Sequence, residues 1–251
     1  MNLDAGPLSL DVEIGGFGSP EVVFKSLAEA LRAMGDGLAA DLDILAHASP
    51  DAEPLLTSKA GRAAIDGARL MQIAPNAALV HAALADIALG LILEMQGGAA
   101  VARVSTGQSI VWIGPVSSVL GLGSSRPPLA MDLAQGLHGS ARRAVALDGR
   151  RAAPDNLSFA DAVVVLSGSA VRAKAAGHAI AKAVPTPSVE GARALAAEII
   201  WDVLGAGARM GQRFKSQQLI EQAVLTAKGR GRTIGGPKAD LLVRFGVSEW
   251  R

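Results

Sequence analysis

The longest apolar stretch of the chain runs from Ala77 to Met95. Its length raises the question of whether the chain is a membrane protein or a globular one. A helix that spans a bilayer needs roughly 20 apolar residues, so this stretch is nearly long enough. His81 and Asp86 interrupt it near its middle, however, where polar side chains are costly in lipid. We therefore expect a buried helix that Asn76 caps at its N-terminus, and no membrane partner.

Small side chains have to build most of the interior around such a helix. Half of the residues are hydrophobic, but only 3% are aromatic and 29 are glycine. This apolar fraction is enough to offset the entropy lost on folding, so we expect a globular chain whose helices pack closely. The scarcity of aromatic rings also makes nucleic acid an unlikely partner, because single strands are commonly bound by stacking on such rings.

The charge balance and the lack of cysteine narrow the possible functions. With 24 basic and 23 acidic residues, the net charge of +1 gives no strong field that would attract nucleic acid or a membrane surface. The absence of cysteine excludes disulfides, thiolate metal sites and cysteine nucleophiles, and it fits a reducing cytoplasm. The four histidines do not follow metal-ligand spacing, so we expect no metal site, and the N-terminal residues do not resemble a signal peptide.

The first half of the chain shows one strand followed by helices. Leu8 to Ile14 alternates apolar and polar residues, which predicts a half-buried strand. Ser19-Pro20 is typical of a helix start, and the apolar stripe that follows extends to Met34. Leu38 to Ala46 and Lys59 to Met71 are predicted to be two further helices.

The second half mixes strands and helices, so the predicted fold class is mixed α/β (α+β), with Ala-rich helices packed on mixed sheets. No fixed-period repeat is visible, and we expect one domain over residues 1–251. The expected strands are Ala99–Val104 and Ser109–Ile113, which would form a hairpin, then Leu129–Gln135, Arg143–Leu147, Phe159–Leu166 and Leu241–Phe245; the expected helices are Ser169–Val184, Val189–Leu204 and Met210–Lys228.

Two residues are candidates for acid–base chemistry. Asp161 lies among apolar neighbours, where a carboxylate is costly unless it is hydrogen-bonded, bound to a metal or capping a backbone. A catalytic role and a purely structural role are both open for it. His138 lies in the flexible segment Gly136–Ser140, which could present an imidazole to a cleft or could be a polar turn.

Two segments could hold an anion. The loop Gly121–Arg126 combines glycines and hydroxyls with a guanidinium, although it matches neither the Walker A nor the Rossmann pattern. The segment Lys228–Lys238 gathers basic residues that include Arg230 and Arg232. It could bind a phosphorylated ligand or RNA, or it could be a solvated, glycine-rich loop.

Three segments in sequence order resemble the ApbE-like superfamily, in particular its uncharacterised branch associated with one-carbon and methanopterin metabolism. Gly6–Glu13 is similar to the opening strand of that branch. Asn76–Met95 followed by Val101–Ile110 is similar to the helix and strand that lead into the NGGD-type turn of the superfamily. Ser158–Leu166, followed by a helix that ends in Ala179–Val184, is similar to its ADA segment.

In the flavin transferases of this superfamily, the NGGD turn helps to hold FAD, and the ADA segment contributes to a Mg²⁺ site together with a nearby hydroxyl. The chain departs from both motifs. Its turn, Ser105–Ser109, contains no acid, and Val163–Val165 supply no hydroxyl after Asp161. Because Mg²⁺ requires oxygen ligands, neither Mg²⁺ nor flavin can be assigned as a cofactor from the resemblance.

The resemblance implies a cytoplasmic protein that binds a small phosphorylated heterocycle and takes part in making a pterin-type one-carbon cofactor such as tetrahydromethanopterin; in the enzymatic version it would be a transferase. Asp161 and His138 are the catalytic candidates. The alternative is a non-catalytic flavin- or pterin-binding or assembly protein, and an Ala-rich helical surface is compatible with a homodimer. The expected ligand-binding residues are Ser105, Thr106, Gly107, Gln108 and Ser109 for the ring, and Arg126, Arg230 and Arg232 for phosphate.

Overall fold

Two compact units make up the chain. The computed structural model describes residues 1–15, 19–47, 54–96, 101–115, 118, 141–152, 158–185, 197–236 and 249–250. The expected single domain stays a prediction. Unit 1 comprises Met1–Arg126, Gly136–Ala144 and Ser169–Val171, and unit 2 comprises Pro127–Gln135, Val145–Gly168 and Arg172–Arg251.

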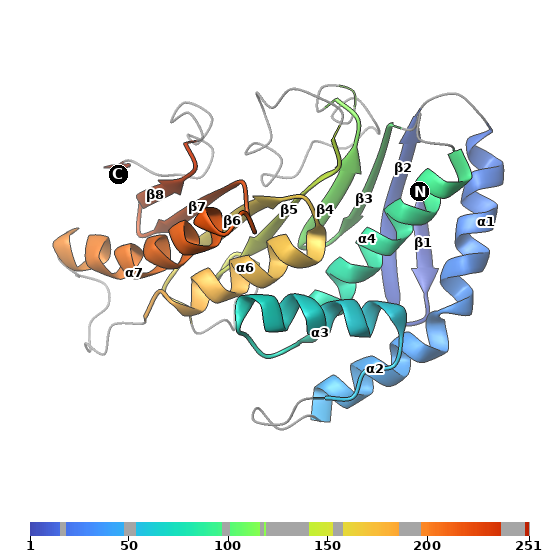
Figure 1. The fold of residues 1–251 in the computed structure, drawn as a ribbon, viewed down its shortest axis with the longest axis horizontal. Helices are drawn as coiled ribbons and strands as arrows, with labels where there is room; N and C mark the ends of the chain where they lie inside the picture. The colour runs from blue at the N-terminus through green and yellow to red at the C-terminus, as the bar shows by residue number, and fades with distance from the viewer. Residues whose placement is uncertain are drawn as a thin grey trace. The chain divides into compact units, whose positions relative to one another are not determined.

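Unit 1 is an antiparallel sheet with helices inserted between its second and third strands (Figure 1). Its strands are hydrogen-bonded in chain order, and the predicted alternation in the second strand is confirmed because Leu8, Leu10 and Val12 are buried. The strands are β1 (Asn2–Ala5), β2 (Leu8–Gly15), β3 (Val101–Thr106) and β4 (Ser109–Ile113); the helices are α1 (Pro20–Ala33), α2 (Gly35–His47), α3 (Lys59–Met71) and α4 (Ala77–Gln96).

The apolar helix α4 packs within unit 1 against α1, α3, β3 and β4. As expected, Asn76 caps it, because its side-chain oxygen accepts a hydrogen bond from the Leu79 amide at 3.2 Å. Asp86 on this helix accepts hydrogen bonds from the amides of Ala170 and Val171, both at 3.0 Å. The helix is long and apolar enough to cross a membrane, as core helices of soluble proteins also are, and its contacts in unit 1 account for that apolar character.

Unit 2 repeats the plan of strands, helices and a final hairpin. The chain passes from unit 1 into unit 2 along β5 (Arg143–Asp148), and the pairs β6–β7 and β7–β8 are antiparallel while β8–β9 is parallel. The mixed α/β class is thus confirmed. The remaining elements are β6 (Ala162–Ser167), α6 (Ala170–Lys182), α7 (Ala197–Ser216), β7 (Gln222–Ala227), β8 (Arg230–Ile234) and β9 (Glu249–Trp250).

The final hairpins of the two units have the same length and the same register. Thr106 lies opposite Ser109 in unit 1, and Ala227 lies opposite Arg230 in unit 2. A glycine with positive φ follows each hairpin, Gly114 at +104° and Gly235 at +85°. No sequence period reveals this repeat, because unit 1 contains the extra helices α2 and α3 and the corresponding side chains differ.

The prediction of a helix over Met210–Lys228 is wrong. Helix α7 ends at Ser216, Gln218 has a positive φ of +58°, and the Leu219 amide donates to the Phe214 carbonyl at 3.0 Å, which is a Schellman-type end. Gln222–Ala227 then form β7 between β6 and β8. A short apolar run suits either a helix or a strand, and here the partner strands decide.

The expected loop over residues 228–238 is also corrected, since its residues 230–234 form β8. Lys228 and Gly229 make a two-residue turn with φ of +48° and +75°, the left-handed conformation that suits a tight hairpin. The predicted strands Leu129–Gln135 and Leu241–Phe245 lie outside the described residues. Other predictions are confirmed within a few residues, among them the helix Lys59–Met71, the hairpin of β3 and β4, and the strand β5.

Two glycines allow α7 to lie close to its neighbours, as the small-residue composition led us to expect. A Cβ atom on Gly207 would lie 2.6 Å from a Val184 methyl and 2.7 Å from a Leu225 methyl. A Cβ atom on Gly211 would lie 2.3 Å from the Ile234 Cδ1 atom. Real Cβ atoms essentially never come this close, so a larger residue forces either these side chains or α7 itself to shift.

We expect Gly207→Ala to destabilise the protein by about 1–3 kcal/mol, because the methyl group overpacks this contact. Gly90→Ala in α4 is the matched control, since a Cβ atom there meets nothing within 4 Å. The control should stabilise the protein by up to about 1 kcal/mol through helix propensity. Urea unfolding of the two variants measures both changes, and two changes of the same sign would contradict the close packing of α7.

Candidate functional site

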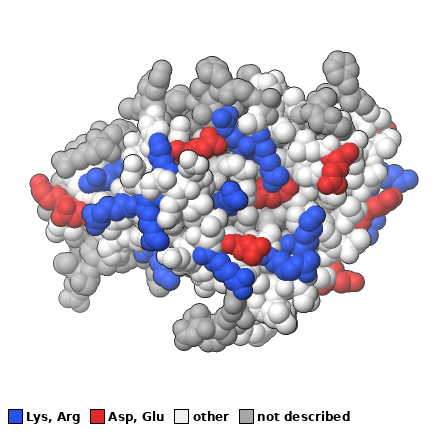
Figure 2. Space-filling view, viewed as in Figure 1, with Lys and Arg blue, Asp and Glu red and all other residues white. Residues whose placement is uncertain are grey.

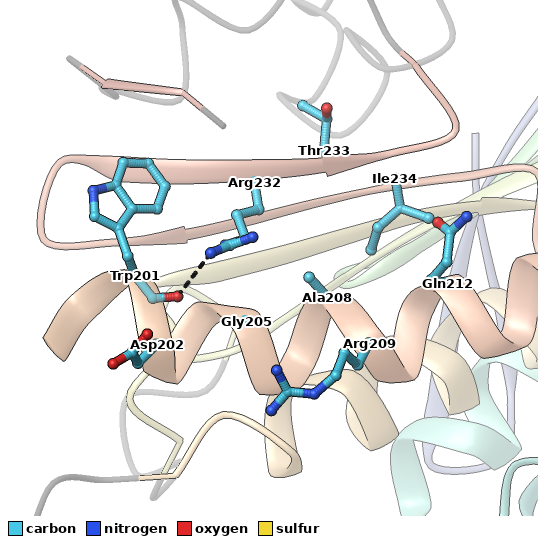
Figure 3. Close-up of a pocket in the computed structure, with 9 residues that line it drawn as sticks. All are labelled: Trp201, Asp202, Gly205, Ala208, Arg209, Gln212, Arg232, Thr233 and Ile234. Atoms are coloured by element: carbon cyan, nitrogen blue, oxygen red, sulfur yellow. Dashed lines mark hydrogen bonds between the residues drawn. The ribbon is translucent and has the colours of Figure 1, made fainter. Parts of the chain in front are cut away.

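A groove between α7 and β8 in unit 2, formed by described residues, is the candidate site. Its volume is about 330 Å³, and side chains from both elements border it (Figure 3). Figure 2 shows basic side chains along α7 and acidic ones at its N-terminal end, an arrangement that complements the helix dipole. The groove is lined by Trp201, Asp202, Gly205, Ala208, Arg209, Gln212, Arg232, Thr233 and Ile234.

Arg232 reaches from β8 toward α7 and is held by Trp201. Its Nη2 atom donates to the Trp201 carbonyl oxygen at 3.1 Å, and its guanidinium carbon lies 5.6 Å from the centre of the indole ring. Both contacts favour the cation at this place. The Nε atom of Arg232 is buried and has no hydrogen-bond partner among the described residues, so one donor of this guanidinium is left unsatisfied.

A second guanidinium converges on the same spot. A Cβ atom on Gly205 would lie 3.6 Å from Arg209 Nη1 and 3.7 Å from Arg232 Nη2, so both guanidinium groups border the space beside this glycine. Figure 3 shows Arg209 extending back along α7 while Arg232 descends from β8. Within the described part of the chain, neither makes an ion pair with a carboxylate. Two cations placed in this way repel each other, and a bound anion would relieve that repulsion.

The repeated hairpin supplies an internal comparison for this site. Arg232 lies opposite Leu225 in unit 2, and the same position of the unit 1 hairpin is occupied by Val111, which lies opposite Val104 and is fully buried. The hairpin therefore forms with an apolar residue at this position. The register of the hairpin by itself therefore does not require an arginine at this position.

Asp161 has the structural role that the sequence analysis left open. Its Oδ2 atom accepts a hydrogen bond from the Lys228 amide at 2.6 Å, and its own amide donates to the Thr226 carbonyl at 2.7 Å. The carboxylate thus stabilises the turn between β7 and β8 by accepting this hydrogen bond, and it does not line the groove. Whether it also has a catalytic role stays a prediction.

The predicted ring-binding residues form the turn between β3 and β4 in unit 1. Thr106 Oγ1 accepts from the Ser109 amide at 3.1 Å and donates to the Ser109 carbonyl at 3.3 Å, so this hydroxyl is used within the turn. Ser105 is the last residue but one of β3, and Gly107 and Gln108 are the turn residues. The turn belongs to unit 1 and Asp161 to unit 2, and the predicted pocket between them stays a prediction.

The three arginines that were predicted to bind phosphate lie in different places. Arg232 lines the groove, whereas Arg230, two residues earlier on β8, does not. Arg126 and the catalytic candidate His138 lie outside the described residues. The sequence analysis missed Trp201, Gly205 and Arg209, for which the only signal was the unusual concentration of glycine within a helical segment.

The described residues form no metal site of the kind that the flavin transferases of the superfamily have. Among them, no group of three or more His, Asp or Glu side chains could hold a metal ion. The group that comes closest to such a site is the ion pair between Lys174 and Asp148, whose charged atoms are 2.8 Å apart. The His178 ring lies 3.9 Å from the same carboxylate oxygen. One acid and two bases do not make an oxygen-rich site for a hard cation.

Comparison of the chain with models of protein families and with curated proteins found no match. The resemblance to the ApbE-like superfamily therefore remains a hypothesis that rests on the three quoted segments.

We expect Asp161→Ala to lower the free energy of unfolding by about 1–2 kcal/mol, because the Lys228 amide loses its acceptor. Asp161→Asn should retain most of the stability, since an amide oxygen can still accept this hydrogen bond. Urea unfolding measures both effects. Full stability of Asp161→Ala would show that the carboxylate does not fasten the turn.

Stability should fall below about pH 6.5, because burial lowers the pKa of His81 and of His178 from the ordinary value. For His178, Asp148 opposes this shift, while Lys174 and Lys182 add to it. The unfolded chain takes up protons at a higher pH than the folded one, so acid favours unfolding. Thermal melts at about pH 5.5 and 7.5 should show a smaller loss in His81→Gln than in the parent, and an equal loss would contradict the lowered pKa of His81.

Proposed function

We propose that the protein binds a small phosphorylated ligand in the groove between α7 and β8. The observation that carries this proposal is the convergence of the Arg209 and Arg232 guanidinium groups over Gly205. Phosphate oxygens match the planar donor geometry of guanidinium, and hydrogen bonds between the two are charge-assisted. Gly205 leaves open the space where an anion would contact both cations.

The rest of the groove suits a compact molecule attached to that phosphate. A volume of about 330 Å³ lies at the lower end of the range for small-molecule pockets. Ala208 and Ile234 offer apolar surface, while Gln212 and Thr233 offer an amide and a hydroxyl. This mixture supports a phosphorylated heterocycle as the ligand. The pterin class, and a role in making a one-carbon cofactor, rest on the superfamily resemblance alone.

A non-catalytic binding protein is the second candidate function. The observation that favours it is the composition of the groove, whose lining residues among the described part of the chain include no histidine or lysine. Asp161, the described catalytic candidate, is engaged at the hairpin turn. An enzyme of cofactor biosynthesis should turn over a phosphorylated pterin precursor, whereas a binding protein should bind it unchanged. Product analysis by mass spectrometry separates the two.

We expect isothermal titration calorimetry to detect binding of inorganic phosphate and tighter binding of a phosphorylated pterin precursor than of its unphosphorylated form. FMN and riboflavin serve as a second matched pair. Arg209→Gln should weaken the binding of every phosphorylated ligand by about tenfold or more, because charge-assisted hydrogen bonds are lost. Arg209 is exposed, so this variant should remain folded.

Arg213→Gln is the control, because it removes the same charge one turn further along α7, outside the groove. It should leave the affinity for phosphate nearly unchanged. If the two variants weaken binding equally, the phosphate is attracted by the general charge of α7, and the groove is not its site. If no phosphorylated ligand binds the parent protein, the proposed function is wrong.

A further inference from the structure

An acidic residue lies in the same groove as the two arginines. Asp202 is exposed, lines the groove, and precedes Gly205 by three residues on α7. Residues three apart lie on the same side of a helix, separated by about 4.5 Å along its axis. In Figure 3, Asp202 and Arg209 lie on the same side of α7, with Gly205 between their positions on the helix. The carboxylate therefore borders the space in which the proposed function puts an anion.

This carboxylate would be a disadvantage in a site that selects a plain anion. An ionised aspartate only accepts hydrogen bonds, and its charge repels a nearby phosphate. In the described part of the chain, it makes no ion pair that would neutralise it. Its position is favourable only if the ligand presents a cation or an N–H donor toward it.

We infer that the groove selects ligands that carry an amino group about one helical turn away from their phosphate. The phosphate lies over Gly205 between Arg209 and Arg232, and the amino group faces Asp202. This inference rests on the proposed function, because it assumes that the phosphate is bound between the two arginines. It goes further by naming the ligand class, a phosphorylated amine, and the residue that recognises the amine.

The test compares phosphoethanolamine with ethyl phosphate, which has a similar size and lacks the amine. At about pH 8 the phosphate of both probes is almost fully ionised and the amine is protonated. Calorimetry on the full chain should show that phosphoethanolamine binds about two- to fivefold more tightly, the range typical of an exposed ion pair.

The variant Asp202→Asn should change the two affinities in opposite directions. It should weaken the binding of phosphoethanolamine, because the partner of the amine is lost, and strengthen the binding of ethyl phosphate, because a repulsion is removed. A loss of folding would weaken both, so the opposite signs separate recognition from damage to the fold. Glu198→Gln is the matched control: it removes the same charge one turn earlier on α7, outside the groove, and should preserve the preference.

The outcomes distinguish this inference from the proposed function. In one outcome, both probes bind, Arg209→Gln weakens the binding of both, and Asp202→Asn leaves the ratio of their affinities unchanged. The groove then binds phosphate without recognising the amine, so the inference is wrong while the proposed function stands. If neither probe nor inorganic phosphate binds, the proposed function fails and the inference fails with it. A preference that disappears in Asp202→Asn and persists in Glu198→Gln supports the inference.

Discussion

The close approach of α7 to the hairpin of β7 and β8 is the contact on which the candidate site depends. Gly207 and Gly211 permit it, since a side chain on either would collide with the sheet or with residues around α6. With the helix at this distance, Arg232 on β8 reaches the Trp201 carbonyl, and the guanidinium groups of Arg232 and Arg209 both border Gly205. The glycines that shape the packing thus also shape the groove, and tight packing and ligand access have a common cause.

The repeat of one hairpin in two units shows which residues the fold requires and which it does not. Both hairpins keep the register and the glycine that follows the last strand, because the backbone there has a positive φ. They differ at the position of Arg232, where unit 1 has the buried Val111. Unit 1 uses its hairpin to bury α4, whereas unit 2 keeps polar groups at the same place. This difference makes the groove a feature of unit 2.

Local patterns predicted those elements whose ends are marked by capping or turn residues. Lys59–Met71 was predicted with its observed bounds, and Asn76 was correctly identified as the cap of α4. The segment after Ser216 was predicted wrongly because Ala, Val and Leu suit a helix and a strand alike, and pairing with β6 and β8 decided its state. Asp161 was identified as a carboxylate in need of a partner, but that partner, the Lys228 amide, is far away in the sequence.

The sequence by itself determined the mixed α/β class, the small-residue core and the limited set of chemical groups that a chain without cysteine can use. Each of these follows from composition or from a short periodic pattern. Only the tertiary structure decided which basic residues act together. Arg232 was one of several candidates, and Arg209 was not among them. Packing of α7 on β8 brings the two guanidiniums to one glycine, and no local pattern records a contact between residues so far apart in the chain.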